Sequence, residues 1–298
     1  ASDWALGTTN FVTTSASGLS GGTFLTVVQT LPPWVYVSGA NGNGSWEGRG
    51  MPTYRVGQMV NITAINGTTI YVDRPAYYTY PTSRLASHTP FGVLHGAGIE
   101  DIALWRVSDV GGQVHNVNVF HADACWLKNV SSTNAAQSHF HFSCTSQCTV
   151  DRCYLDSMDD GFDHTSGQSY GIYTEDYNSD MLIIDNIVKG CRHGILFQGA
   201  TAGSVIAYNL IHYGHSDDVT FVGADMGTHT AHPFFNLYEG NICNNIWHDN
   251  TFGSSSHNLS YRNWFRNMSE ARPSGWGRYG WTVKAPSWSN SLMGTVIG

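Results

Sequence analysis

Charged residues are scarce in this 298-residue chain, at 12% of the sequence, and lysine and arginine form no run. Asp and Glu number 22 against 14 Lys and Arg, which gives a formal net charge of -8 at pH 7. A protein that binds nucleic acid needs a basic surface to replace the counterions along the phosphates. The composition therefore excludes nucleic acid as a partner, and it disfavours a substrate rich in uronic acids.

Long apolar segments are also missing. No stretch approaches the ~18 consecutive apolar residues of a membrane-spanning helix, so we expect no membrane insertion. The first residues lack the basic and then apolar pattern of a signal peptide. The six cysteines and the six Asn-x-Ser/Thr sequons, together with the few charges, favour an exported protein that is extracellular or on the cell surface.

Helical patterning is nearly absent, and the sequence instead indicates an all-β protein. Residues 1–90 contain short β segments, such as 24–28 and 69–72, separated by glycine-rich or proline-rich turns. Asn66-Gly67 between two alternating runs is typical of a two-residue hairpin. We therefore expect a β-rich N-terminal region that forms a cap or side sheet on the rest of the chain.

Residues 91–298 carry a loose repeat in which a polar anchor follows a short apolar run. The anchors are Asn129, Arg152, Asn186, Asn209, Asn241 and Asn263, at intervals of 23, 34, 23, 32 and 22. Two positions before them stand Leu127, Val150, Ile184 and Ala207, and the pattern fails at Glu239 and Tyr261. A coil of about 22 residues cannot bury its apolar face by itself, so such coils must stack on one another. The repeat therefore predicts a right-handed parallel β-helix. A β-sandwich or a propeller is the alternative.

The repeat places two cysteines in the same position of adjacent coils. Cys125 and Cys148 are 23 residues apart and each lies four positions before its anchor. We predict a disulfide between them, with two stacked, buried thiols as the alternative. In the same register, Lys128 lies over Asp151 as a pair of opposite charges.

Several segments resemble a known group of proteins. These are Gly98–Asp101, Tyr170–Ile172, Gly203–Asn209, His232–Asn241 and Gly253–Asn258. Over residues 55–298 they are similar to a bacterial group of right-handed parallel β-helix proteins in the pectate-lyase-like superfamily. That superfamily includes polysaccharide lyases, polygalacturonase-type hydrolases, epimerases, viral tailspikes and non-catalytic glycan binders. Such proteins usually begin with several further coils, so the resemblance implies either a homo-oligomer or coils supplied by another segment.

Candidate catalytic residues lie in the densest acidic segment. It contains Asp159, Asp160 and Asp163, and glycoside hydrolysis needs such a pair of carboxyl groups, one protonated and one ionised. The later Arg192-His193-Gly194 resembles the His-Gly turn of polygalacturonase-type hydrolases, which gives His193 a catalytic role and Arg192 a role in orienting substrate. The alternative is that the acidic segment forms a turn cluster or a calcium site. The proposed hydrolysis requires no cofactor, and Ca²⁺ is the one candidate for a bound cofactor.

Histidines and aromatic residues are abundant, with 14 His, 10 Trp, 15 Tyr and 13 Phe. Sugar rings stack on aromatic planes while their hydroxyls bond to polar side chains, so this composition suits a neutral polysaccharide. We assign His139, Tyr170, Arg192 and His232 to substrate binding, against the alternative of a histidine ladder satisfied by its neighbours. In an extended strand His139 and His141 would point to the same side, but no third ligand is identifiable and we predict no metal site.

The sequence therefore predicts an exported β-helix protein that cleaves a neutral or weakly charged glycan by acid/base chemistry. Hydrolysis is favoured over lyase chemistry because of the charge balance. The alternative is a non-catalytic carbohydrate-binding module, or an adhesin or tailspike-like fibre subunit.

Overall fold

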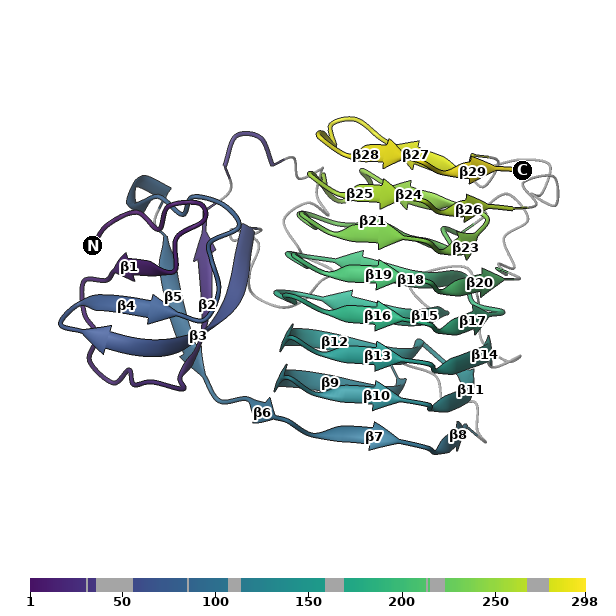
Figure 1. The fold of residues 1–298 in the computed structure, drawn as a ribbon, viewed down its shortest axis with the longest axis horizontal. Helices are drawn as coiled ribbons and strands as arrows, with labels where there is room; N and C mark the ends of the chain where they lie inside the picture. Colours follow the sequence, from purple (N-terminus) through teal and green to yellow (C-terminus); the bar gives the residue numbers. More distant parts are fainter. Residues whose placement is uncertain are drawn as a thin grey trace.

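The computed structural model describes residues 1–30, 32–35, 56–84, 86–106, 114–158, 169–212, 214, 223–266 and 279–298. In these ranges the regular structure is β-strand, apart from one 3-10 turn at Thr82–Arg84. Figure 1 shows two parts side by side, a small N-terminal sheet and a tall stack of coils. Within the described part, no helix is long and apolar enough to cross a membrane.

The N-terminal part is an antiparallel sheet in the order β1-β4-β3-β2-β5. Its strands are β1 (Asn10–Val12), β2 (Phe24–Gln29), β3 (Val56–Asn66), β4 (Thr69–Val72) and β5 (Ser87–Phe91). The hairpin between β3 and β4 turns at Gly67, whose φ of +60° lies in the left-handed region that glycine adopts without strain. The expected hairpin is present, but its two-residue loop is Gly67-Thr68 and not Asn66-Gly67, since Asn66 pairs with Thr69.

The second part consists of three parallel sheets of eight strands each, and consecutive strands of the chain pass from one sheet to the next. The first sheet contains β6 (Leu94–His95), β9 (His115–Asp123), β12 (Ser138–Ser146), β15 (Tyr170–Glu175), β18 (His193–Gln198), β21 (Met226–His229), β24 (Ile246–His248) and β27 (Trp281–Val283). The second contains β7 (Gly98–Glu100), β10 (Trp126–Lys128), β13 (Thr149–Asp151), β16 (Leu182–Ile184), β19 (Val205–Ala207), β22 (Leu237–Glu239), β25 (Leu259–Tyr261) and β28 (Ser291–Met293). The third contains β8 (Ala103–Trp105), β11 (Ser131–Ala135), β14 (Tyr154–Met158), β17 (Ile187–Lys189), β20 (Leu210–His212), β23 (Ile242–Cys243), β26 (Trp264–Phe265) and β29 (Val296–Ile297).

Each coil contributes one strand to every sheet, which is the architecture of a right-handed parallel β-helix and confirms the predicted fold. Successive partners in the second sheet are 28, 23, 33, 23, 32, 22 and 32 residues apart. The short coils match the predicted period. In the longer coils, the extra residues fall between a third-sheet strand and the next first-sheet strand, in segments that lie outside the described residues.

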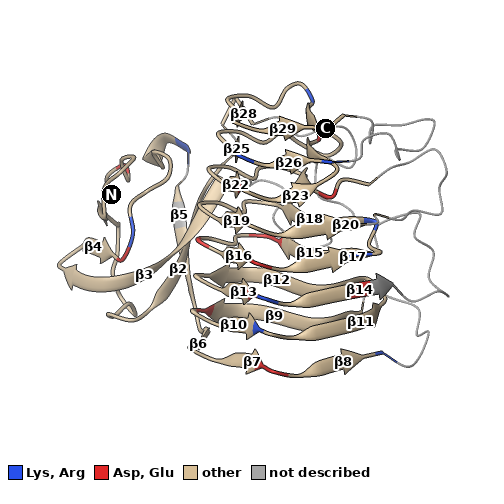
Figure 2. Ribbon diagram, turned by 45° about the vertical axis from the view of Figure 1, so that its right-hand side comes forward, with Lys and Arg blue, Asp and Glu red and all other residues tan. Residues whose placement is uncertain are grey.

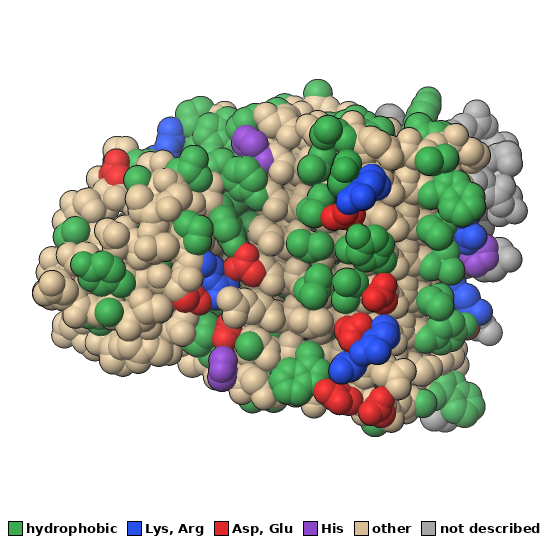
Figure 3. All heavy atoms as spheres, viewed as in Figure 1, with side chains coloured by type: hydrophobic (Ala, Val, Ile, Leu, Met, Phe, Trp, Pro, Cys, Tyr) green, Lys and Arg blue, Asp and Glu red, His purple; other side chains and the backbone are tan. Residues whose placement is uncertain are grey.

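The strand pairing corrects one step of the predicted register. Val150 pairs with Ile183, so the interval between these coils is 33 residues and not 34. A slip of one residue exchanges the inward and outward faces of every later strand. The buried column is Leu127, Val150, Ile183, Ile206, Tyr238 and Ser260, without the failure that the sequence suggested. The apolar residues one position after an anchor, which are Ile187, Leu210, Ile242 and Trp264, point outward, and Figure 3 shows such columns of apolar side chains on the surface.

A ladder of buried asparagines fixes the corner between the second and third sheets. The Oδ1 of Asn209 accepts hydrogen bonds from the backbone N–H and the side-chain Nδ2 of Asn186, at 3.0 and 2.9 Å. Its Nδ2 donates to the carbonyl of Ile183 and to Oδ1 of Asn241, both at 3.0 Å. Asn241 and Asn263 repeat the pattern one coil further on. A second ladder, built from Asn236, Asn258 and Asn290, holds the corner between the first and second sheets.

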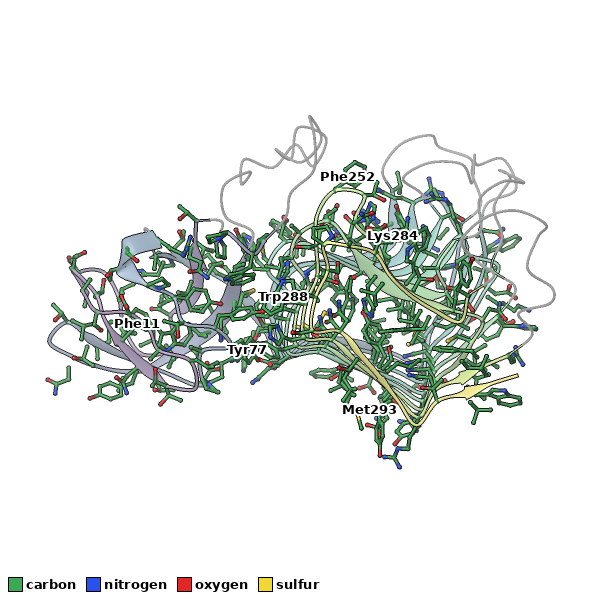
Figure 4. The ribbon with its side chains drawn as sticks, turned by 90° about the horizontal axis from the view of Figure 1, so that it is seen from above. Phe11, Tyr77, Phe252, Lys284, Trp288 and Met293 are labelled. Carbon is green, nitrogen blue, oxygen red and sulfur yellow. The ribbon has the colours of Figure 1, made fainter. Side chains whose placement is uncertain are left out.

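The N-terminal sheet and the solenoid share one hydrophobic cluster. Tyr177, Ala202 and Phe234 from the coils pack among the buried residues of the N-terminal strands. Beside this cluster, Arg74 forms an ion pair with Asp180 at 2.5 Å. Figure 4 shows the two parts meeting at this junction, where Tyr77 and Trp288 are labelled.

The predicted disulfide is not formed. Cys125 and Cys148 do lie on adjacent coils in the expected register, but all six cysteines of the chain are free thiols. The physical reason is the geometry of the parallel sheet, since neighbouring strands lie about 4.8 Å apart. A disulfide needs Cβ atoms about 3.8 Å apart and directed at each other, whereas stacked side chains point in the same direction. Lys128 faces Asp151 across the same pair of strands, as expected.

The free thiols lead to a prediction about reactivity. Burial raises the pKa of Cys148 to about 12 and that of Cys153 to about 11, so we expect these thiols to be inert in the native protein. After denaturation without reductant, titration with Ellman's reagent should detect all six cysteines of the chain. A titre of four would instead show that one disulfide is present.

The asparagine ladder leads to a second prediction. Asn209→Ala removes the acceptor for the Asn186 N–H and the donor to the Ile183 carbonyl, both in the interior. Because each orphaned buried group costs about 1–3 kcal/mol, we expect the free energy of unfolding to fall by about 3 kcal/mol. Urea unfolding followed by circular dichroism measures it. Asn10→Ala, at an exposed position of β1, is the matched control, and an equal loss in both variants would contradict a special role of the ladder.

Candidate functional site

The outward face of the first sheet gathers polar and aromatic side chains. In β12, Phe140 and Phe142 point into the core, whereas His141 and Ser143 point outward. The parallel register continues this division through the following coils. Since partners in parallel strands stack about 4.8 Å apart, outward residues of equal position form columns along the solenoid. We call this surface the outer face.

Five rings form a continuous stack on the outer face. The ring centroids of His115 and His141 are 4.2 Å apart, and those of His141 and Tyr173 are 5.1 Å apart. Tyr173 lies 4.7 Å from Tyr170 at an interplanar angle of 9°, and Tyr170 lies 5.5 Å from His193. The stack therefore crosses four coils, and offset stacking of this kind adds to the stability gained from burial.

A buried carboxylate lies beside the ring stack. Glu175 is only 8% exposed, and its Oε2 lies 3.1 Å from Nε2 of His141. The hydroxyl of Tyr173 donates to Oε1 of Glu175 and also lies 3.1 Å from Oε1 of Gln198. On its other side, the His141 ring contacts Oδ1 of Asn118 through Nδ1 at 2.9 Å. Each carboxylate oxygen of Glu175 therefore contacts a group that can exchange a proton, the phenol of Tyr173 or the imidazole of His141.

A second polar pair lies higher on the outer face. Nδ1 of His229 contacts Oδ2 of Asp249 at 2.5 Å, and Nζ of Lys284 lies 4.5 Å from the ring centroid of Trp247. Gly227 allows this close approach of the coils, because a Cβ there would lie 2.0 Å from the carbonyl oxygen of Trp247. Figure 4 shows Lys284 and Phe252 on the opposite side of the coils from Met293 of the second sheet.

Buried titratable groups mark the corner between the third and first sheets. The Ala224 N–H donates to Nδ1 of His193 at 3.0 Å. Burial and the nearby charge of Arg192 hold the pKa of His193 well below its usual range, so its imidazole is neutral at pH 7. Asp225 accepts the Asn244 N–H at 2.6 Å, and burial raises its pKa to about 7. A carboxyl with this pKa can donate or accept a proton near neutral pH.

The structure brings together part of the predicted site. Tyr170 stacks on His193 and forms a hydrogen bond with Arg192. Sequence reasoning did not single out Glu175 or Asp225. The signal that could have found them is the coil register, which places Glu175 two residues after outward-facing Tyr173 and places Asp225 against the His-Gly turn.

Two predicted sugar-binding histidines lie in the interior. His139 is fully buried and contacts Oγ of Ser132 through Nδ1 at 2.9 Å. His232 is fully buried at the junction with the N-terminal part, where its Nε2 contacts Oγ of Ser256 at 2.8 Å and its ring lies 5.4 Å from that of Trp34. Burial lowers the pKa of His232 to about 3, so it is neutral at pH 7. Neither residue presents a surface to solvent.

The acidic candidates Asp159, Asp160 and Asp163 lie outside the described residues. In the sequence they fall between β14, which ends at Met158, and β15, which begins at Tyr170. The predicted calcium candidate falls on this same segment. Among the residues that the structure describes, no group of three or more His, Cys, Asp or Glu is placed to hold a metal ion.

Comparisons with known proteins support the fold. No protein-family model and no curated protein sequence matches the chain. The chain is similar to the crystal structure of the tailspike protein gp49 from Pseudomonas phage LKA1, with a TM-score of 0.56 and 14% identity over 88% of this chain and 45% of that one. It is also similar to the tailspike gp61 of Pseudomonas phage phi297, with a TM-score of 0.51 and 9% identity over 99% of this chain and 54% of that one. The likeness shows a shared β-helix architecture, and the chain spans only part of either protein's length.

The raised pKa of Asp225 gives a testable dependence of stability on pH. The unfolded state releases this proton near pH 3.8, whereas the native state keeps it up to about pH 7. Between these values the native state binds more protons, so this group's contribution to stability falls as pH rises, by about 1.4 kcal/mol per pH unit. In Asp225→Asn this dependence should vanish. Urea unfolding at intervals from pH 4 to pH 8 compares the two slopes, and parallel profiles would contradict the assignment.

Proposed function

We propose that the chain binds a neutral or weakly charged polysaccharide along the outer face and cleaves it by acid/base hydrolysis. The observation that carries the proposal is the ring stack with Glu175 held between Tyr173 and His141. This arrangement places aromatic rings on the outward side of the first sheet beside a group that can transfer a proton, and Tyr170, Tyr173 and His141 are each 5% exposed or less.

The charge distribution supports a neutral substrate. Figure 2 shows acidic and basic residues spread singly over the coils, without a continuous basic stripe. A cleft for many carboxylates or sulfates would need such a stripe. A neutral glycan needs hydrogen-bonding side chains and aromatic rings instead, and the outer face supplies them through Gln198, His229 and the ring stack.

Hydrolysis of a glycosidic bond requires two carboxyl groups. One protonates the leaving oxygen, and the other acts as a base for the attacking water or as a nucleophile at the anomeric carbon. Glu175 supplies one carboxyl group in this proposal, and Asp159, Asp160 or Asp163 supplies the other from the segment that leads into Tyr170. In this proposal His193 and Arg192 lie beside the reacting bond, since both contact Tyr170. No cofactor takes part in this chemistry.

The second candidate is a non-catalytic glycan binder. It is favoured by one observation, which is that two solved structures to which the chain is similar are phage tailspike proteins. In this version the chain is an exported or virion-surface fibre subunit, or an adhesin, and the outer face holds a polysaccharide without breaking it. The pectate-lyase-like resemblance is compatible with either version.

Glu175→Gln separates the two candidates. The amide keeps the shape of the side chain but cannot transfer a proton, so we expect cleavage to fall by about 10²–10⁴-fold while polysaccharide binding stays within a few-fold. The assay uses a panel of neutral and acidic polysaccharides, with reducing ends measured for cleavage and affinity electrophoresis for binding. Absorbance of unsaturated products reports lyase chemistry.

Asp156→Asn is the matched control, because Asp156 lies on the third sheet in an ion pair with Lys189 at 2.9 Å. It should leave both cleavage and binding unchanged. Binding without any product in the wild-type protein would establish the non-catalytic version. Unsaturated products would show that cleavage proceeds by lyase chemistry and not by hydrolysis. The absence of both binding and cleavage would overturn the proposed function.

A further inference from the structure

The N-terminal sheet curls into a partly closed barrel. Its edge strands are β1 and β5, which are the first and last in the order of the sheet. These edges approach each other, since Oγ1 of Thr13, just after β1, contacts Nε2 of His88 in β5 at 2.9 Å. The rings of Phe11 and His88 lie 6.1 Å apart across the same seam. The two edges form no strand pairing with each other among the described residues, so the seam stays open.

A cavity of about 390 Å³ occupies this seam. Aromatic and aliphatic side chains from Trp4, Phe11, Val27 and Tyr80 line its interior. Trp4 and Tyr80 stack at 5.3 Å with an interplanar angle of 22°, which holds their rings in place. Hydroxyl groups surround the opening, and they belong to Ser2, Thr13, Thr14, Ser15 and Thr82.

The described lining carries no acidic or basic side chain other than His88. Burial lowers the pKa of His88 from 6.5, so its ring is uncharged at pH 7. The α-amino group of Ala1 also belongs to the described lining. The lining thus combines an apolar side with several hydroxyl groups, which suits a molecule that has one apolar face and several hydroxyl groups of its own.

We propose that this cavity is a second glycan-binding site, which takes one or two neutral sugar units. The apolar face of a sugar ring would lie against the aromatic residues while its hydroxyls bond to the serine and threonine hydroxyls at the opening. The volume is at the lower end of the roughly 300–1,000 Å³ of small-molecule sites, which suits a sugar unit better than a long oligosaccharide.

The cavity is separate from the outer face. Figure 4 shows Phe11 in the N-terminal sheet, beyond the junction at Tyr77 and Trp288 and away from the coils. Its lining contains no residue of the solenoid among those described. The proposed cavity site therefore does not rest on the proposed cleavage, and each can fail without the other.

The test uses the full chain and ligand-observed saturation-transfer NMR, followed by calorimetric titration. The probes are methyl glycosides of neutral hexoses and N-acetylhexosamines, together with neutral disaccharides. We expect at least one of them to bind with a millimolar dissociation constant. Thr14→Trp, at an exposed position on the cavity's rim, should fill the opening and raise that constant at least tenfold.

Ser17→Trp is the matched control, because Ser17 is equally exposed in the same loop but does not line the cavity. It should change the dissociation constant less than twofold, and both variants should keep the thermal midpoint of the wild-type protein. Sugar binding should persist in Glu175→Gln, and polysaccharide cleavage should persist in Thr14→Trp.

Three results would overturn this inference. They are no binding of any sugar probe, binding that Thr14→Trp leaves unchanged, and binding that Glu175→Gln abolishes. A neutral apolar dye, N-phenyl-1-naphthylamine, separates the ligand classes. If Thr14→Trp displaces the dye while no sugar binds, the cavity takes an apolar molecule and the sugar assignment is wrong.

Discussion

The asparagine ladders are the constraint on which the rest of the solenoid depends. At each corner the backbone turns away from the strand ladder, and residues such as Asp185 and Tyr208 adopt positive φ values of 57° and 55°. Peptide groups at such corners lose their strand partners, and buried peptide groups without partners are costly. The stacked amides supply these partners and bond to one another, so every coil must stop at the same position. The ladders therefore set the register for all three sheets.

This register is what assembles the outer face. The rings of His141, Tyr173 and Tyr170 come from two coils and can stack only because their strands are aligned residue for residue. The same alignment brings Glu175 to His141, although they are separated by 34 residues of sequence. A buried carboxylate is tolerated where hydrogen bonds replace its lost hydration. The cost of burying Glu175 is thus offset by partners that only a fixed coil spacing can provide.

The sequence predicted the architecture because the repeat is a property of the backbone period, which recurs in every coil. The sequence could not establish which residues of the later strands face inward. Where an insertion makes one coil longer than the next, an alignment error of one residue goes unnoticed. Such an error occurred between Val150 and Ile183, and it put Ile184 and Ala207 in the column that Ile183 and Ile206 occupy. The disulfide failed for a related reason, since equal position in two coils implies stacking but not the Cβ approach of a bond. Glu175 and Asp225 were missed because burial, which makes their chemistry unusual, is not visible before the register is known.

The junction between the N-terminal sheet and the solenoid holds the two parts in a fixed orientation. Tyr177 and Phe234 of the coils are buried in the cluster that forms the interior of the N-terminal sheet, and Arg74 is held by both Asp73 and Asp180. A hydrophobic interface of this kind, closed by a buried cation, opposes independent movement of the two parts. The two proposed glycan-binding surfaces, held rigidly on one chain, would act on a long polymer together, because binding at one raises the local concentration of the polymer at the other. A weak cavity site on the N-terminal sheet would therefore strengthen the hold of the outer face on a polysaccharide far more than on a single sugar.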